Sequence, residues 1–183
     1  MRFVWTTKYN KIKNDDNVDW LPVFSSECFR LAKNNTAHYC FCSFHKIDLF
    51  KQSLQKYFII KNILVWEKNN TSMGDLKGDF APKHELIIFF QKGRKEINGS
   101  RDPNIFKFNK TGNKLHPTQK PLDMFEYLIK KFSNENDIIF DAFAGSGTTA
   151  IAAINTNRKW VCIEKEKEYY DIAIKRIQEH GWK

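Results

Sequence analysis

The segment 137–164, DIIFDAFAGSGTTAIAAINTNRKWVCIE, constrains the fold of this chain more than any other stretch. An apolar run ends in Asp141, a turn of small residues and a helical stretch follow, and a second apolar run ends in Glu164. This order predicts a strand, a tight glycine turn, a helix and a second, parallel strand. Such a βαβ unit is typical of an α/β fold with a doubly wound, mostly parallel sheet.

The glycine turn indicates a site for a nucleotide-like ligand. Gly145 and Gly147 have no Cβ atoms that would keep a ligand away from the backbone. Thr148 opens a helix whose first N–H groups have no partner within the helix. Glu164 follows the neighbouring strand, where a carboxylate can accept both hydroxyls of a ribose. The pattern therefore predicts a cofactor that carries a nucleoside.

The turn by itself leaves three interpretations open. Residues 145–150 fit the dinucleotide fingerprint G-x-G-x-x-G/A, with an acidic residue at about the expected distance. A triphosphate site is disfavoured because no lysine follows the glycines. The third interpretation is a glycine turn that only joins a strand to a helix.

The segment before the turn decides between these interpretations. His116-Pro117-Thr118-Gln119-Lys120-Pro121 precedes an amphipathic helix at 122–132, and IEKEKEYYDIAIKRI follows the second strand. Together with DAFAGSGTT, this ordered set resembles the S-adenosylmethionine-dependent DNA amino-methyltransferases. It is most similar to the circularly permuted class, in which the cofactor half follows the catalytic half. The resemblance runs along residues 14–177 and displaces a nicotinamide-dependent dehydrogenase.

The resemblance implies an enzyme that moves a methyl group from S-adenosylmethionine to adenine N6 or, less favoured, to cytosine N4 in DNA. It implies a Rossmann-like methyltransferase fold and no metal. The residues that it assigns to the cofactor are Pro117, Thr118, Gln119, Lys120, Asp141, Phe143, Ala144, Gly145, Ser146, Gly147, Thr148 and Glu164.

The catalytic residues remain unassigned. The resembling family carries a tetrapeptide, Asp/Asn/Ser-Pro-Pro-aromatic, whose oxygens accept the hydrogens of the target amine and whose ring stacks on the flipped base. No Pro-Pro pair occurs in the 183 residues. Asp102-Pro103-Asn104-Ile105 lacks the aromatic residue and follows polar residues, so we reject it.

The missing tetrapeptide predicts an interrupted sheet. In the resembling family an N-terminal stretch supplies two strands, one of them beside the strand before the glycine turn, and residues 1–17 look like the linker that follows it. Without these strands, backbone groups next to the cofactor site lack partners. We expect a rearranged sheet, a second copy or a partner chain that fills the gap, or a truncated and inactive product. The alternative function is therefore a non-catalytic module that binds DNA and cofactor.

Basic charge in the middle of the chain favours duplex DNA as the partner. The formal net charge is +9, and residues 61–120 hold 12 Lys and Arg against 6 Asp and Glu. Such a segment neutralises phosphates, although a solvated basic surface has the same composition. The residues that we expect to contact DNA are Lys68, Asn69, Asn70, Lys77, Lys92, Arg94, Lys95 and Arg101.

Hydrophobic periodicity predicts the remaining elements of a single domain. Helices are expected at 20–33 and 47–56, and strands at 37–43, 59–67 and 85–91. The last two strands would form an antiparallel hairpin at one edge of the sheet, with a long polar connection, and 93–115 would be an irregular loop. We divide the domain into part of the catalytic half (1–67), a DNA-facing connection and loop (68–115) and the cofactor-binding half (116–183).

The expected compartment is the cytoplasm. No apolar run reaches membrane-spanning length, and no signal peptide is present. Cys28, Cys40, Cys42 and Cys162 lie in apolar patterns without zinc-ribbon spacing, which indicates buried, reduced thiols.

Overall fold

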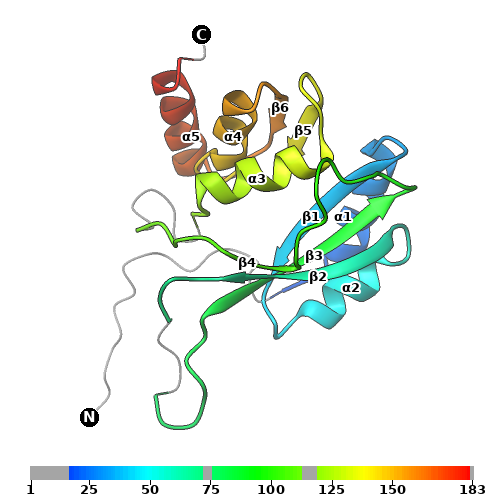
Figure 1. Ribbon diagram of the computed structural model, residues 1–183, viewed down its shortest axis with the longest axis vertical. Helices are drawn as coiled ribbons and strands as arrows, with labels where there is room; N and C mark the ends of the chain where they lie inside the picture. Colours follow the sequence, from blue (N-terminus) through cyan, green and yellow to red (C-terminus); the bar gives the residue numbers. More distant parts are fainter. Residues whose placement is uncertain (1–16, 72–75, 113–118, 182–183) are drawn as a thin grey trace.

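The computed structural model describes residues 17–71, 76–112 and 119–181. Helices and strands alternate along the chain except for one run of three consecutive strands, and they form an α/β arrangement in which helices pack on two sheets (Figure 1). In chain order the elements are α1 (Leu21–Leu31), β1 (Thr36–Cys42), α2 (Ile47–Leu54), β2 (Ile59–Glu67), β3 (His84–Lys92), β4 (Ile105–Lys107), α3 (Leu122–Phe132), β5 (Ile138–Asp141), α4 (Thr148–Asn155), β6 (Lys159–Cys162) and α5 (Lys167–Glu179).

The larger sheet has the strand order β1-β3-β2-β4. β3 is antiparallel to both β1 and β2, so the predicted hairpin of β2 and β3 is confirmed. Its predicted position at the sheet edge is corrected, because Ile105–Lys107 pair in parallel with Val65–Glu67 on the far side of β2. The segment expected to be an irregular loop thus contains a short strand.

The predicted βαβ unit is confirmed in the C-terminal part of the chain. β5 and β6 form a separate parallel pair, with Asp141 opposite Cys162, and α4 connects them. Apolar residues of α3 and α4 cover one face of this pair, where Ile129 and Ala152 pack with Ile139. Among the described residues no strand joins β5 to β1, so the expected interruption of the sheet is confirmed.

Helices on two sides hold the two sheets together across this interruption. On one side, Phe125 of α3 stacks on Phe41 of β1, with ring centroids 5.6 Å apart and planes 7° apart. On the other side, Trp20 and Phe24 at the start of α1 contact Phe143, which follows β5, at 5.6 and 5.2 Å between ring centroids. β1 and β5 therefore lie between the same two layers without pairing.

The same contacts show which ends of the sheets meet. The start of α1 contacts Phe143, whereas its last residues contact Lys92, which lies opposite Thr36 at the start of β1. The end of α1 thus lies beside the start of β1 with Lys92, and the start of α1, together with Phe143 and the glycine turn, lies toward the carboxyl end of β1. The connection between β2 and β3 also leaves the sheet at the carboxyl end of β1, because Cys42 lies opposite Leu86.

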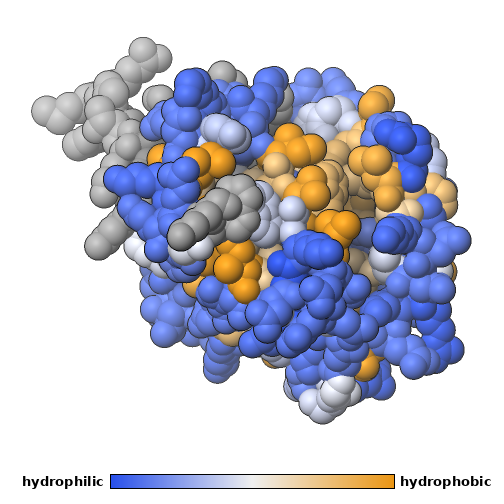
Figure 2. Space-filling view, turned by 90° about the horizontal axis from the view of Figure 1, so that it is seen from above, coloured by the Kyte–Doolittle hydropathy of each residue, from blue (hydrophilic) through white to orange (hydrophobic). Residues whose placement is uncertain are grey.

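The outer face of β5 and β6 is apolar and exposed. Ile138 and Phe140 of β5 are 58% and 44% exposed, and Val161 and Ile163 on β6 and just after it are 49% and 52% exposed. Viewed from above, hydrophobic residues gather around a hollow on the side of the molecule where β5 and β6 lie (Figure 2). Within the described residues, no helix combines the length and apolarity needed to cross a membrane.

Candidate cofactor site

The glycine turn is held between the ends of β5 and β6. The Ile163 N–H donates to the carbonyl of Asp141 (2.8 Å), and the Ala144 N–H donates to the carbonyl of Ile163 (3.0 Å), so the parallel pairing continues past both strands. Gly147 has φ +80°, and a Cβ at this position would lie 3.0 Å from the Cβ of Ala173 on α5. Glycine is therefore required here both by the backbone angle and by the close approach of α5.

Two carboxylates flank the turn, as the sequence predicted. Glu164 accepts the N–H of Gly145 through Oε2 and the N–H of Glu166 through Oε1, each at 2.8 Å. Asp141 accepts the N–H of Phe143 at 2.9 Å and the hydroxyl of Thr149. These bonds fix both carboxylates in orientation. Because an ionised carboxylate offers about four acceptor sites, each can still accept hydroxyl or ammonium donors from a ligand.

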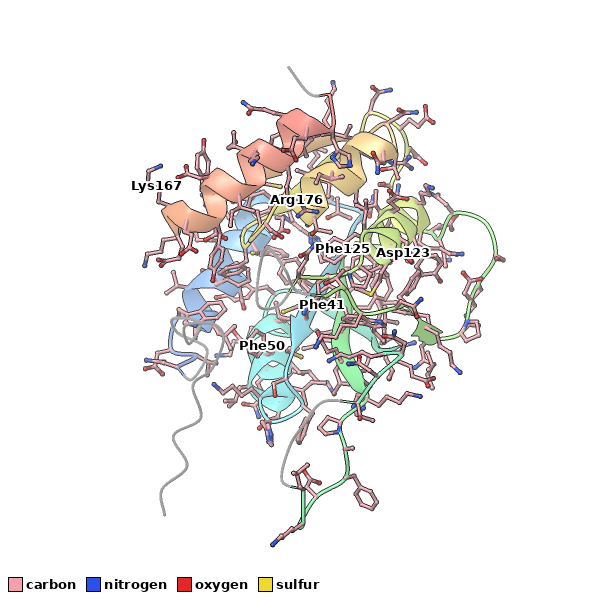
Figure 3. All side chains as sticks on the ribbon, turned by 90° about the vertical axis from the view of Figure 1, so that its left-hand side faces the viewer. Phe41, Phe50, Asp123, Phe125, Lys167 and Arg176 are labelled. Atoms are coloured by element: carbon pink, nitrogen blue, oxygen red, sulfur yellow. The ribbon has the colours of Figure 1, made fainter. Side chains whose placement is uncertain are left out.

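Arg176 is a residue of this site that the sequence reasoning missed. Its guanidinium donates to the carbonyl of Ser146 and, at 3.0 Å, to the Ser146 hydroxyl. Arg176 lies on the same side of α5 as the buried residues Ala173 and Ile177, so the helical period offered a weak signal. In Figure 3, which views the molecule from the left-hand side of Figure 1, Arg176 lies above Phe125 and Phe41.

The second group of predicted cofactor residues is described only in part. Pro117 and Thr118 lie outside the described residues. The carbonyl of Gln119 accepts the hydroxyl of Thr111 at 3.0 Å. Two residues after Lys120, Leu122 packs on Ala150 and Ile151 of α4, so this segment lies beside the helix that the glycine turn opens.

Lys120 is paired with a carboxylate of the larger sheet. Its Nζ lies 2.7 Å from Oε2 of Glu85, and Nζ of Lys68 lies 2.9 Å from Oε1 of the same residue. Burial on its own would raise the pKa of Glu85, but Lys120 and Lys68 outweigh it and hold the pKa below its ordinary value. The expectation that Lys68 contacts DNA is not supported by these surroundings, since the side chain is 9% exposed and paired.

A polar pocket lies where the hairpin connection leaves the sheet. It has a volume of about 380 Å³ and is lined by Asn69, Asn70, Lys110, Thr111 and Gly112. The side-chain oxygen of Asn69 accepts the N–H of Lys110 at 2.9 Å, which joins the two segments that form the pocket. The end of the sheet that carries the glycine turn therefore also carries three of the predicted DNA-binding residues, namely Asn69, Asn70 and the exposed Lys77.

The other predicted DNA-binding residues lie toward the opposite end. Nζ of Lys92 donates to the carbonyls of Phe29 and Ala32, both at 2.8 Å, and so caps the end of α1. Arg94, with its exposed ion pair to Glu96, and Lys95 follow directly. Arg101 belongs to the loop that Asn98 fastens to the end of α3. These positions argue against a single DNA-binding surface made from all eight residues.

Asp102, which the sequence analysis rejected as a catalytic residue, is bonded to three side chains. Its carboxylate bonds Lys131 (2.5 Å), the hydroxyl of Tyr127 (2.8 Å) and the hydroxyl of Ser100 (3.0 Å). The hydrogen bonds from Lys131, Tyr127 and Ser100 lower the pKa of Asp102 to about 2. Asp102 therefore fastens the loop after β3 to α3.

Known proteins are similar to this chain in sequence and fold. The family model described as DNA methylase matches residues 5–175. The type II methyltransferase M2.MboI of Moraxella bovis is 30% identical over 182 residues, 89% of this chain and 65% of that protein. The DNA adenine methyltransferase YhdJ of Escherichia coli strain K12 is 28% identical over 200 residues, 90% of this chain and 68% of that protein.

A solved structure is similar to the same extent. The structure of the M1.HpyAVI–SAM complex superposes with a TM-score of 0.76 at 30% identity, and it covers 86% of this chain and 82% of that chain. The chain spans between 54% and 74% of the length of seven curated relatives.

Proposed function

This chain belongs to the DNA methylase family of S-adenosylmethionine-dependent amino-methyltransferases, and we propose that it supplies the cofactor pocket and a DNA-binding surface for site-specific methylation of adenine N6. The name of the relative YhdJ, a DNA adenine methyltransferase, favours adenine over cytosine as the target. The relatives are longer than this chain, so the activity proposed is that of the completed enzyme.

The arrangement of Glu164 and Asp141 around the glycine turn carries this proposal. Glu164 already accepts two backbone N–H groups at 2.8 Å, so its carboxylate is fixed where the two hydroxyls of a ribose can donate to it. Asp141 and Gly145 would lie along the methionine part of the cofactor. The residues present therefore fit S-adenosylmethionine, whose sulfonium supplies an electrophilic methyl group.

The chain's own contribution to the reaction is orientation. The fixed acceptors Asp141 and Glu164 would hold the cofactor in one orientation without reorganisation, which would lower the entropic part of the barrier to methyl transfer. Phe143 is 63% exposed next to the turn, with its ring against Trp20 and Phe24, and it provides an apolar wall for the same ligand.

The DNA-binding surface is proposed at the carboxyl end of the strands. Asn69, Asn70 and Lys110 line the polar pocket, and Lys77 belongs to the connection next to it. An asparagine side chain can pair bidentately with adenine, and a lysine can neutralise a phosphate. The location beside the cofactor-binding half supports this surface over the one around Lys92.

A partner strand is proposed between β5 and β1. Both strands have one unpaired edge among the described residues, and both lie between α1 and α3. The exposed apolar face of β5 and β6 beside these edges (Figure 2) suits a partner segment that combines a strand with an apolar helix face. That segment would carry the Asp-Pro-Pro-aromatic sequence that is absent from these 183 residues.

Titration calorimetry with S-adenosylhomocysteine and with NAD tests the cofactor assignment. We expect the first ligand to bind and to raise the melting temperature, because a ligand that binds only the folded state stabilises it by mass action. We expect NAD to do neither. Equal binding of the two ligands would contradict the assignment.

The second candidate function is a non-catalytic module that binds DNA and cofactor. The absence of any Pro-Pro pair from the sequence favours it. The two candidates differ in one measurement, since only the first predicts methyl transfer after a segment with Asp-Pro-Pro-aromatic is supplied.

A further inference from the structure

Glu85 is a single carboxylate that holds two lysines from different parts of the chain. Its Oε1 pairs with Lys68 at 2.9 Å and its Oε2 with Lys120 at 2.7 Å. The side chains of Glu85, Lys68 and Lys120 are 28%, 9% and 18% exposed, so the cluster is largely shielded from water. Trp66, which is 1% exposed, lies against both ammonium groups, at 5.6 Å from Lys68 and 5.9 Å from Lys120.

Glu85 is the carboxylate that both lysines share, and in the part of the chain that the structure describes neither lysine pairs with a second one. In such surroundings an ammonium group that loses its partner is left as an uncompensated, partly buried charge. Removal of the negative charge of Glu85 would therefore affect both lysines at once. Each lysine would have to move toward water, and each would carry its own chain segment with it.

The two segments lead to different sides of the proposed enzyme. Lys120 belongs to the segment with the predicted cofactor residues, here called the cofactor segment, and lies two residues before Leu122, the first residue of α3, which packs on α4 behind the glycine turn. Lys68 opens the connection between β2 and β3, where its N–H donates to the carbonyl of Lys83 at 2.8 Å. The next residue, Asn69, lines the polar pocket and holds the backbone of Lys110.

We infer that Glu85 is a positioning residue that couples binding of the cofactor to binding of DNA. The inference rests on the proposed function, since it needs both ligands. By fixing Lys120 and Lys68 in one geometry, Glu85 orders the cofactor segment and the root of the DNA-binding connection together. A ligand that holds the lysine on one side still therefore also holds, through Glu85, the lysine on the other side, so the second ligand loses less conformational entropy and each ligand strengthens the binding of the other.

Fluorescence anisotropy of a labelled duplex, with and without saturating S-adenosylhomocysteine at fixed salt, tests this coupling. For the unmodified chain we expect the ligand to tighten DNA binding at least about fivefold, within the ordinary range for coupled sites. For Glu85→Gln we expect less than about a twofold change, because the amide cannot hold two ammonium groups.

Glu67→Gln provides a matched control on the neighbouring strand. Glu67 also pairs with two lysines, Lys83 at 2.9 Å and Lys107 at 3.3 Å, but neither belongs to the cofactor segment. We expect this variant to keep the full coupling. Equal loss of coupling in Glu67→Gln and Glu85→Gln would overturn the specific role of Glu85.

Lys68→Gln separates positioning from folding. It removes the ion pair that joins Glu85 to the connection between β2 and β3 and leaves the pair of Glu85 with Lys120. We therefore expect the affinity for S-adenosylhomocysteine to stay within about twofold, while the coupling to DNA binding is lost. Full coupling in both Lys68→Gln and Glu85→Gln would overturn the inference. If the unmodified chain binds neither ligand, the proposed function fails instead.

Discussion

The two ends of the sheets use charged side chains for different purposes. At the carboxyl end, Asp141 and Glu164 accept N–H groups of the glycine turn and of the residues after β6. At the opposite end, side chains donate to the last carbonyls of helices: Lys92 to α1, and Asn98 to the carbonyls of Lys130 and Ser133 at the end of α3. The last four carbonyls of a helix have no partner within it, and cations near them are favoured by the helix dipole.

The difference shows why charge counts mislead in the middle of this chain. Residues 92–101 and 68–77 are both polar and basic in sequence. The first segment lies where two helices end, so part of its cationic and amide donors is used to cap them. The second begins at the end of the sheet where the glycine turn lies, and its described residues Asn69 and Asn70 line the polar pocket there.

The largest expected effect concerns methyl transfer at the carboxyl end. We expect no transfer to DNA by the 183-residue chain, because its sequence contains no Asp-Pro-Pro-aromatic tetrapeptide to polarise an exocyclic amine and to stack on a flipped base. A segment that ends in Asp-Pro-Pro-Tyr, fused ahead of Met1 or added as a separate polypeptide, should restore it. Incorporation of tritium from labelled S-adenosylmethionine into mixed-sequence DNA measures transfer by the chain alone and by the chain with the added segment.

A matched segment in which Asp-Pro-Pro-Tyr is replaced by Ala-Pro-Pro-Ala serves as the control. This control segment should bind the 183-residue chain but should not restore methyl transfer. Robust transfer by the chain alone would show that the catalytic residues lie among those already present.

The next largest effect is expected for Glu164→Gln. The amide retains the shape of the side chain but loses the charge-assisted hydrogen bonds to a ribose, which contribute about 1.5–3 kcal/mol each. Affinity for S-adenosylhomocysteine in calorimetry should fall by about 10- to 100-fold. Glu168→Gln, at an exposed position in the first turn of α5, should leave it unchanged. An unaltered affinity in Glu164→Gln would remove the ribose assignment.

Local signals explain which parts of the fold could be predicted from the sequence. The βαβ unit follows from neighbouring residues, since an apolar run, small residues and a second run define it. The position of Glu164 beside Gly145 then follows from the parallel pairing of β5 and β6. The three-residue strand β4 is too short to show a period of its own, and it is recognised by its parallel pairing with the edge of β2.

The partners of the charged residues could not be predicted, because they are distant in sequence. Lys92 donates to carbonyls that lie 60 and 63 residues away, and Lys120 pairs with a carboxylate 35 residues away. Hydrophobic periodicity places a side chain on a face but does not identify its partner. The assignment of Lys92 and Lys68 to DNA rested on the basic charge of the segment and on the family resemblance, and neither identifies the partner of a single side chain.

The third prediction is a pH dependence that belongs to β1 and β3, outside the cofactor site. Burial, with a smaller contribution from the charge of Lys92, lowers the pKa of His38 to about 4. In the unfolded chain the pKa is about 6.5, so between these values the unfolded state binds more protons. Stability should fall by up to about 3 kcal/mol as the pH drops from 6.5 to 4, and this group should cause no further loss below pH 4.

Urea unfolding at several pH values measures this slope. His38→Phe should remove most of the pH dependence, because a phenylalanine ring can stack on Phe90 as the His38 ring does but has no group that titrates. His45→Gln, at an exposed position, should retain it. A slope in His38→Phe equal to that of the unmodified chain would assign the pH dependence to other groups.

The fourth prediction compares two glycines with left-handed backbone angles. Gly147 has φ +80° and Gly99 has φ +72°, but only at Gly147 would an added Cβ have a neighbour within 4 Å, namely Ala173. A left-handed angle costs an alanine about 1–2 kcal/mol. Gly99→Ala should lower the free energy of unfolding by about that amount. Gly147→Ala should lower it by more, because α5 must also move to make room for the Cβ. If thermal unfolding shows the same loss of stability in both variants, α5 can move away from the added Cβ without an energetic penalty.

The smallest expected effects separate the two ends directly, through Lys92→Met and Lys110→Met. Lys92→Met removes the cap on α1 and should lower the free energy of unfolding by about 1–2 kcal/mol, while the salt dependence of DNA binding stays the same. Lys110→Met, in the polar pocket, should leave stability within about 0.5 kcal/mol and reduce the salt slope by up to about one unit. Anisotropy titrations of duplex DNA at several salt concentrations, combined with urea unfolding, measure both quantities for both variants. If Lys92→Met instead flattens the salt slope and Lys110→Met does not, DNA binds at the end of the sheet away from the glycine turn, and the capping interaction of Lys92 is then broken when DNA binds.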